Sequence, residues 1–188
     1  MRGEIPEIIS TARLRLRPWQ LDDAGDVFKY ASDEEWSRYL PVPHPYTKTH
    51  AEEFVARQVL LDRSLHSAWA AELEGVVVGG LNLGLVAEHC RGTMGWSIAK
   101  RVWSQGLASE AASAVIHAAF NALPDLNRIS ASADSRNFGS LRVMEKVGMQ
   151  REGLFRQYRR AGGEPTDEVW CAILRDEWLA SRPDGDRR

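Results

Sequence analysis

The chain has 188 residues, of which 44% are hydrophobic, and its 24 basic and 26 acidic residues give a formal net charge of −2. This length suits a single domain with a substantial core, which we expect to span residues 1–182 ahead of a disordered polar tail at 183–188. The balanced charge gives no general attraction to nucleic acid or to an anionic membrane surface, so neither is expected as a partner.

The first residues, M-R-G-E-I-P-E-I-I-S, place two glutamates and a proline where a secretory signal has an apolar core, so we expect a cytoplasmic protein. The longest apolar run, at 76–87, is well below the ~20 residues that span a bilayer. Cys90 and Cys171 lack C-x-x-C or metal-ligand spacing and are interpreted as reduced thiols in the core. The histidines also lack ligand spacing, so no metal site is expected.

The first third of the chain predicts one strand followed by two helices. Apolar and basic residues alternate over 11–18, which is typical of a half-buried strand. Asp22 is the expected N-cap of the first helix, and a capping box of Thr49 and Glu52 is expected to open the second. The proline-rich segment 41–45 between the two helices is expected to be a loop.

The rest of the chain alternates short apolar runs with helical patterns. In chain order the predicted elements are strands at 67–73, 76–85 and 93–99, a helix at 107–121, a strand at 128–134, a helix at 138–147, and strands at 149–159 and 168–174. Such a mixed order favours an α/β sheet with helices packed on it over a helical bundle or an all-β sandwich.

A stretch of small residues, W-S-Q-G-L-A-S-E-A-A at 103–112, joins a predicted strand to a predicted helix. The first amides of a helix lack intrahelical partners and carry partial positive charge, which suits a phosphate group, and Gly106 and Ala108 would leave these amides accessible. The same residues would also suit a tight turn that lets the helix pack close to the sheet. No dinucleotide-binding or P-loop glycine motif is present, which disfavours a dehydrogenase or a P-loop nucleotidase.

Five segments, in this order and spacing, resemble the GCN5-related N-acetyltransferases (GNAT), within them the RimJ/RimL-like branch that acetylates ribosomal-protein N-termini. The segments are T-A-R-L-R-L-R-P, G-W-S-I-A, W-S-Q-G-L-A-S-E-A, N-F-G-S-L-R-V-M-E-K-V-G-M and R-E-G-L-F-R. The resemblance implies an α/β (α+β) fold whose mixed, mostly antiparallel sheet has seven strands, with helices on both faces. It also implies that the sheet is splayed between its fourth and fifth strands, with acetyl-CoA in the split.

The resemblance also implies how acetyl-CoA is held. Backbone amides of the loop and helix start would bind the pyrophosphate, and the preceding strand would pair with the pantetheine arm. The implied residues are Gln105, Gly106, Leu107, Ala108 and Ser109 for the pyrophosphate, and Trp96, Ser97, Ile98 and Asn137 for the pantetheine arm.

Acetyl transfer to an amine requires a proton for the leaving thiolate. The resemblance implies Ser140 as this donor, although from the residues alone Ser140 could be an ordinary surface residue and Asn137 an N-cap. Many relatives have a tyrosine as the acid where this chain has Met144, whose thioether cannot donate a proton.

The general base stays open at this point. Relatives often carry a glutamate where this chain has Met94, and the remaining candidates are Glu152, Asp167 or a chain of water molecules. Either acid could equally be a solvated surface residue.

The leading hypothesis is an N-acetyltransferase that moves an acetyl group from acetyl-CoA to a primary amine. The acceptor implied by the resemblance is the N-terminal α-amine of a ribosomal or other protein, and a small-molecule amine is the alternative. A non-catalytic acyl-CoA-binding protein is a further hypothesis, because methionines stand where relatives carry proton-transfer groups. Homodimers are common among similar proteins, but the residues themselves do not reveal an oligomeric state.

Overall fold

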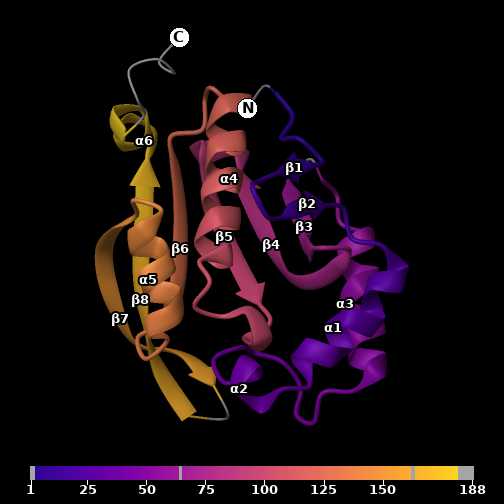
Figure 1. Cartoon of the computed structure of the whole chain (residues 1–188). Helices are drawn as coiled ribbons and strands as arrows, with labels where there is room; N and C mark the ends of the chain where they lie inside the picture. Colours follow the sequence, from indigo (N-terminus) through magenta and orange to yellow (C-terminus); the bar gives the residue numbers. More distant parts are fainter. Residues whose placement is uncertain (1–2, 64, 162–163, 182–188) are drawn as a thin grey trace.

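A computed structural model describes residues 3–63, 65–161 and 164–181, so the tail predicted at 183–188 lies outside the described residues. Within them the chain forms one eight-stranded sheet in the order β1-β2-β3-β4-β5-β6-β8-β7, with helices packed on it (Figure 1). The strands are β1 (Ile9–Ser10), β2 (Arg15–Arg17), β3 (His66–Leu73), β4 (Val76–Val86), β5 (Arg91–Ile98), β6 (Arg128–Asp134), β7 (Gln150–Ala161) and β8 (Glu164–Leu174).

The sheet is split in its middle. Every neighbouring pair of strands is antiparallel except β5 and β6, which run parallel. Their pairing covers only 91–93 of β5 and 128–130 of β6, after which the two strands diverge. The predicted mixed, mostly antiparallel sheet with a splay next to the W-S-Q-G segment is therefore confirmed.

The sheet has one strand more than the seven expected, because Ile9 and Ser10, ahead of the strand predicted at 11–18, form β1 and only Arg15–Arg17 of the predicted strand forms β2. The Thr11 amide donates to the Leu14 carbonyl at 2.9 Å, and the Leu14 amide donates to the Thr11 hydroxyl at 2.9 Å. These bonds close a turn between β1 and β2, each of which is only two or three residues long. The split consequently lies between the fifth and sixth strands.

Two of the observed helices were not predicted, namely α2 and α6. The α-helices are α1 (Ala24–Ala31), α2 (Glu34–Ser37), α3 (Lys48–Val59), α4 (Leu107–Ala122), α5 (Phe138–Lys146) and α6 (Arg175–Ser181), and short 3₁₀ turns occupy η1 (Leu21–Asp23), η2 (Ala87–His89) and η3 (Lys100–Val102). Both missed helices have seven residues or fewer, which is too short for a helical period to stand out in the sequence.

Both predicted helix caps in the first third of the chain are wrong. The residue before α1 is Asp23, and its carboxylate accepts two hydrogen bonds from the Arg17 guanidinium at 2.8 and 2.9 Å instead of capping the helix. The capping box of α3 is formed by Thr47 and His50, since each side chain accepts a hydrogen bond from the backbone amide of the other. The helix therefore starts at Lys48, two residues closer to the proline-rich loop than the pair Thr49 and Glu52 had indicated.

The helices cover both faces of the sheet. Residues 67–71 of β3 are buried one after another. Because successive side chains of a strand point to opposite faces, the sheet must be covered on both sides here. One face carries α4 and α5 (Figure 1). The buried side of α4 consists of seven apolar residues: Leu107, Ala111, Ala112, Val115, Ile116, Ala119 and Phe120.

The two cysteines differ in burial. Cys171 is buried in the core, as predicted, and burial raises the pKa of its thiol. Cys90 is only half-buried, at the end of η2, so its assignment to the core was wrong. In the described part of the chain, no helix combines the length and the apolar character needed to cross a bilayer.

Candidate functional site

A cavity of about 440 Å³ lies where β5 and β6 diverge. Its floor and walls come from parts of the fold that are far apart in the sequence. The polar and backbone contributions include Gly95, Trp96 and Ser97 from β5, Ser132 and Asp134 from β6, Asn137 and Ser140 at the start of α5, Arg159 and Arg160 from β7, and Thr166 and Glu168 from β8. The split in the sheet therefore brings the predicted pantetheine strand and the predicted acid together.

The strand β5 has a backbone edge facing the split. On its other side Trp96, Ser97 and Ile98 are in register with Leu81, Gly80 and Gly79 of β4. Beyond Thr93, no described strand pairs with the β6-facing edge. An extended chain with amide groups could add to this edge as a further strand. The Ile98 carbonyl already accepts a hydrogen bond from the Trp103 indole at 2.6 Å, so this acceptor at the end of β5 is already in use.

The W-S-Q-G segment turns into α4 through two left-handed residues. Ser104 has φ of 61° and Gly106 has φ of 79°, a region in which glycine carries no steric penalty. Alternation of left- and right-handed residues turns neighbouring amides toward one side and forms an anion-binding concavity. The first helical hydrogen bond runs from the Glu110 amide to the Gly106 carbonyl at 3.0 Å, so the amides of residues 107–109 have no acceptor within the helix.

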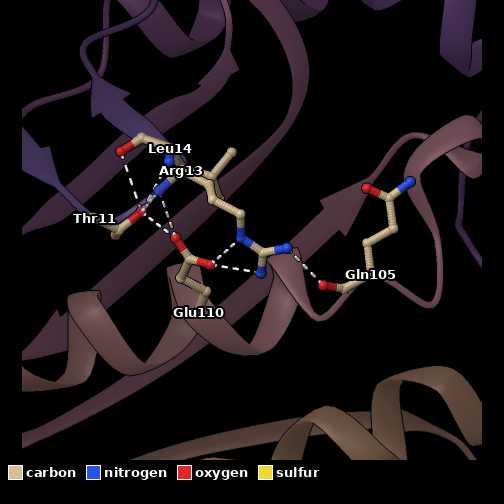
Figure 2. Close-up of polar contacts among 5 residues, drawn as sticks. All are labelled: Thr11, Arg13, Leu14, Gln105 and Glu110. Atoms are coloured by element: carbon tan, nitrogen blue, oxygen red, sulfur yellow. Dashed lines mark hydrogen bonds and ion pairs between the residues drawn. The ribbon is translucent and has the colours of Figure 1, made fainter.

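A second polar cluster fixes the outer side of this loop (Figure 2). The Arg13 guanidinium donates to Glu110 Oε2 at 2.7 Å and to the Gln105 carbonyl at 2.9 Å. Glu110 Oε1 accepts from the Arg13 amide at 3.0 Å and from the Thr11 hydroxyl. Burial raises the pKa of Glu110, but the hydrogen bonds from Thr11 and Arg13 outweigh it and hold the pKa below its ordinary value. No periodicity or motif in the sequence links residues 97 positions apart, so this cluster could not be predicted.

The start of α5 holds the predicted acid at the cavity wall. The Asn137 side-chain oxygen accepts a hydrogen bond from the Ser140 amide at 3.1 Å, so Asn137 is the N-cap of the helix. Both residues line the cavity, with the Ser140 side chain half-buried. Met144 on the next turn and Met94 on β5 are buried, and their thioethers have no proton to donate.

The two acids predicted as candidate bases lie outside the residues that line the cavity. Glu152 is exposed and accepts two hydrogen bonds from the Arg128 guanidinium, at 3.1 and 2.6 Å. Asp167 accepts a hydrogen bond from the Gln157 amide at 2.8 Å. Each carboxylate therefore already has a partner in the protein, away from the cavity wall.

Two other carboxylates line the cavity, and the first is Glu168, which was not predicted from the sequence. Its side chain is only 3% exposed. Its Oε1 accepts a hydrogen bond from the Ser132 hydroxyl at 2.7 Å, and Oε2 lies 2.9 Å from Arg159 Nε without hydrogen-bond geometry. One signal for Glu168 was available in the sequence. Asp167 and Glu168 are neighbours in a strand, so their side chains must point to opposite faces of the sheet and only one of them can face the cavity.

A second acid at the wall, Asp134, is committed to a salt bridge. The Arg136 guanidinium donates to its two oxygens at 2.9 and 2.7 Å. Hydrogen bonding to Arg136 lowers the pKa of Asp134, which makes this carboxylate a poor proton acceptor. Glu168 is the less tightly paired of the two, because its ion pair with the exposed side chain of Arg159 is a single contact.

Aromatic rings from the first third of the chain form the outer part of the cavity. Trp19 packs edge-on against Phe54 with ring centroids 5.4 Å apart, and Tyr30 packs against Trp36 at 5.2 Å. Trp36, together with Pro41 and Val42 of the proline-rich loop, contributes to the lining. The indole nitrogens of Trp19 and Trp36 are buried without a hydrogen-bond partner among the described residues.

Comparison with known proteins agrees with this geometry. Residues 13–150 match the acetyltransferase (GNAT) domain. The N-acetyltransferase YnaD of Bacillus subtilis, named as uncharacterised, is 33% identical over 171 residues, which cover 90% of this chain and 98% of YnaD. A GNAT-family acetyltransferase from Bacillus anthracis has 30% identity and a TM-score of 0.79, over 90% of this chain and 99% of that one.

A more distant structure shares the fold alone. It is RimL, named as the ribosomal L7/L12 alpha-N-protein acetyltransferase and solved in complex with coenzyme A, with 18% identity and a TM-score of 0.80 over 89% of this chain and 98% of RimL. The family of the chain is shown instead by the match over residues 13–150 and by the 33% identity to YnaD. From these two similarities, together with the split sheet and the loop that begins α4, we conclude that the chain is an acyltransferase of the GNAT family.

Proposed function

We propose that the protein transfers the acetyl group of acetyl-CoA directly to a primary amine, with donor and acceptor bound at the same time. One observation carries this proposal: a single cavity joins an unpaired strand edge, the Ser140 hydroxyl and the buried Glu168 carboxylate. Direct transfer needs a proton donor for the thiolate and a proton acceptor for the amine on either side of the reacting carbon. The cavity offers one residue for each task.

Acetyl-CoA fits the part of the site between β5 and α5. Its diphosphate would lie on the unpaired amides at the start of α4, from Gly106 through Leu107 and Ala108 to Ser109, with Gln105 contributing at the rim. Its pantetheine amides would pair with Trp96, Ser97 and Ile98 along the open edge of β5, and Asn137 would contact the arm from α5. The RimL structure in complex with coenzyme A supports such an assignment for this fold.

The chemistry assigns one role to each polar residue. The neutral amine attacks the thioester carbonyl carbon, the carbon–sulfur bond breaks, and the Ser140 hydroxyl gives its proton to the leaving thiolate. The amine loses its proton to Glu168, directly or through one water molecule, because this carboxylate lies at the cavity wall and its Oε2 is paired there with the exposed side chain of Arg159. Glu152 and Asp167 stay candidate bases, and the kinetics of single variants at the three carboxylates compare them with Glu168.

The acceptor is a primary amine attached to an apolar or aromatic group. The outer cavity is lined by aromatic side chains, which attract an ammonium group to their faces and bury an apolar body. Two buried indole N–H groups, on Trp19 and Trp36, would gain partners from an oxygen near that amine. A peptide N-terminus carries such an oxygen in its first carbonyl group, and a small amino-acid-like amine carries one as well.

The test is thiol release from acetyl-CoA in the presence of a panel of amines. The panel should contain peptides with aromatic, aliphatic and acidic first residues, together with small aromatic amines and polyamines. The proposal expects acceptor-dependent release of coenzyme A, fastest for amines next to an apolar group. Tight binding of acetyl-CoA with no acceptor-dependent release across the panel would instead indicate a non-catalytic acyl-CoA-binding protein.

A further inference from the structure

We propose that Arg13 is a positioning residue for the acyl donor: it holds the Gln105–Gly106 peptide in the orientation that presents the Gly106 amide to the diphosphate. This inference rests on the proposed function, because it assumes that acetyl-CoA binds at the start of α4. It adds a residue from the opposite end of the chain to that site, outside the loop and the helix themselves.

The contacts around Arg13 form a closed bridge (Figure 2). One side of the guanidinium forms an ion pair with Glu110 in the first turn of α4, with Nε and NH2 at 2.7 and 2.6 Å from Oε2. The remaining nitrogen, NH1, donates to the Gln105 carbonyl at 2.9 Å. Arg13 therefore links the loop directly to the helix that follows it.

The bridge fixes the direction of one amide. A trans peptide unit is planar, and its carbonyl and N–H groups point in opposite directions. Since Arg13 holds the Gln105 carbonyl, the Gly106 N–H points away from Arg13. Arg13 reaches the loop from the β1–β2 side, whereas the split lies on the other side of β5, toward β6 (Figure 1). The fixed amide thus points away from the β1–β2 turn.

The bridge also neutralises a carboxylate at the mouth of the helix. A negatively charged Glu110 in the first turn would by itself repel a diphosphate. The hydrogen bonds from Arg13 and from the Thr11 hydroxyl hold this carboxylate on the β1–β2 side and balance its charge. The two strands of that turn are very short, so these side-chain bonds are a substantial part of its attachment to α4.

The experiment measures the affinity of the purified protein for acetyl-CoA and for its dephospho form, which keeps the diphosphate but lacks the 3′-phosphate, by isothermal titration calorimetry. Arg13→Gln should weaken binding of both by about tenfold, the size expected when a charge-assisted hydrogen bond no longer orders a binding group. Arg15→Gln removes an exposed cation two residues further along, at the start of β2, and should leave both affinities unchanged. Thermal unfolding of each variant verifies that it is folded.

For a second variant, the positioning role and simple electrostatics predict opposite changes in the affinity for acetyl-CoA. Glu110→Gln removes a negative charge beside the diphosphate, which alone would tighten binding. Positioning requires weaker binding instead, because Arg13 loses its ion-pair partner. Tighter binding in this variant, or unchanged binding in Arg13→Gln, would overturn the inference. Loss of affinity for acetyl-CoA alone in Arg13→Gln would also overturn it, since Arg13 would then contact the 3′-phosphate. If the wild-type protein bound neither donor, the proposed function itself would fail.

Discussion

At the scale of single residues, the chemistry depends on how the fold separates polar groups of similar type. Asp134 and Glu168 both line the cavity, yet the first accepts two hydrogen bonds from the Arg136 guanidinium and the second forms a single ion-pair contact with the exposed Arg159. Asp167 and Glu168 are neighbours in the chain, and the pleat of β8 directs only Glu168 into the cavity.

The Ser140→Ala variant tests the proposed acid. We expect turnover to fall by about 100-fold, because a positioned general acid typically contributes a factor of that order. Acetyl-CoA affinity should stay nearly constant, since the Ser140 backbone amide still donates to the Asn137 cap. Steady-state kinetics and calorimetry measure the two quantities, and unchanged turnover would remove Ser140 from the mechanism.

The Glu168→Gln variant tests the proposed base. We expect kcat/KM for the amine to fall by about 100-fold while acetyl-CoA still binds, because glutamine keeps the shape and the contact with Ser132 but accepts no proton. Glu152→Gln and Asp167→Asn serve as matched variants, with carboxylates that lie outside the cavity lining. A large loss of kcat/KM in either of these, with Glu168→Gln unaffected, would assign the base elsewhere.

At the scale of elements, the loop and the two ends of α4 place the site. The N-terminal end presents unpaired amides through the left-handed Gly106. At the C-terminal end, the Arg175 guanidinium donates to the carbonyls of Phe120, Leu123 and Leu126. A helix anchored at both ends cannot shift along the sheet, so its first amides keep their place beside β5.

The Gly106→Val variant tests the loop. A branched side chain at φ of 79° is strained, and its Cβ would lie 3.7 Å from Arg13 NH2, beside the contact that orients the loop. We expect at least tenfold weaker acetyl-CoA binding, measured by calorimetry. Gly75→Val is the matched control, because Gly75 has φ of 80° in the open β3–β4 turn. Equal affinities in both variants would count against the loop assignment.

The Arg175→Met variant tests the anchor at the other end of α4. Three backbone carbonyls would lose a charged donor, so we expect the free energy of unfolding to fall by about 2 kcal/mol, the order associated with hydrogen bonds to a charged group. Urea unfolding followed by circular dichroism measures it. Arg142→Met, on the exposed side of α5, should change the stability little. Equal stability of the two variants would contradict the anchoring role.

At the scale of the whole molecule, local patterns in the sequence were enough to predict the long elements, whereas the split in the sheet was implied only by the resemblance to the GNAT family. The helix predicted at 107–121 is α4, and the strands predicted at 67–73 and 76–85 are β3 and β4, within one residue at each end. Contacts between distant parts of the chain could not be predicted. The Arg13–Glu110 ion pair and the Ser132–Glu168 hydrogen bond join residues 97 and 36 positions apart, and no local pattern encodes such pairs.

The most direct test of the account is a crystal structure of the protein with bound coenzyme A. We predict the diphosphate on the amides of residues 106–109, and the pantetheine arm beside the open edge of β5 with its sulfur close to Ser140. A coenzyme bound on another surface, or a pantetheine arm outside the split between β5 and β6, would contradict the account.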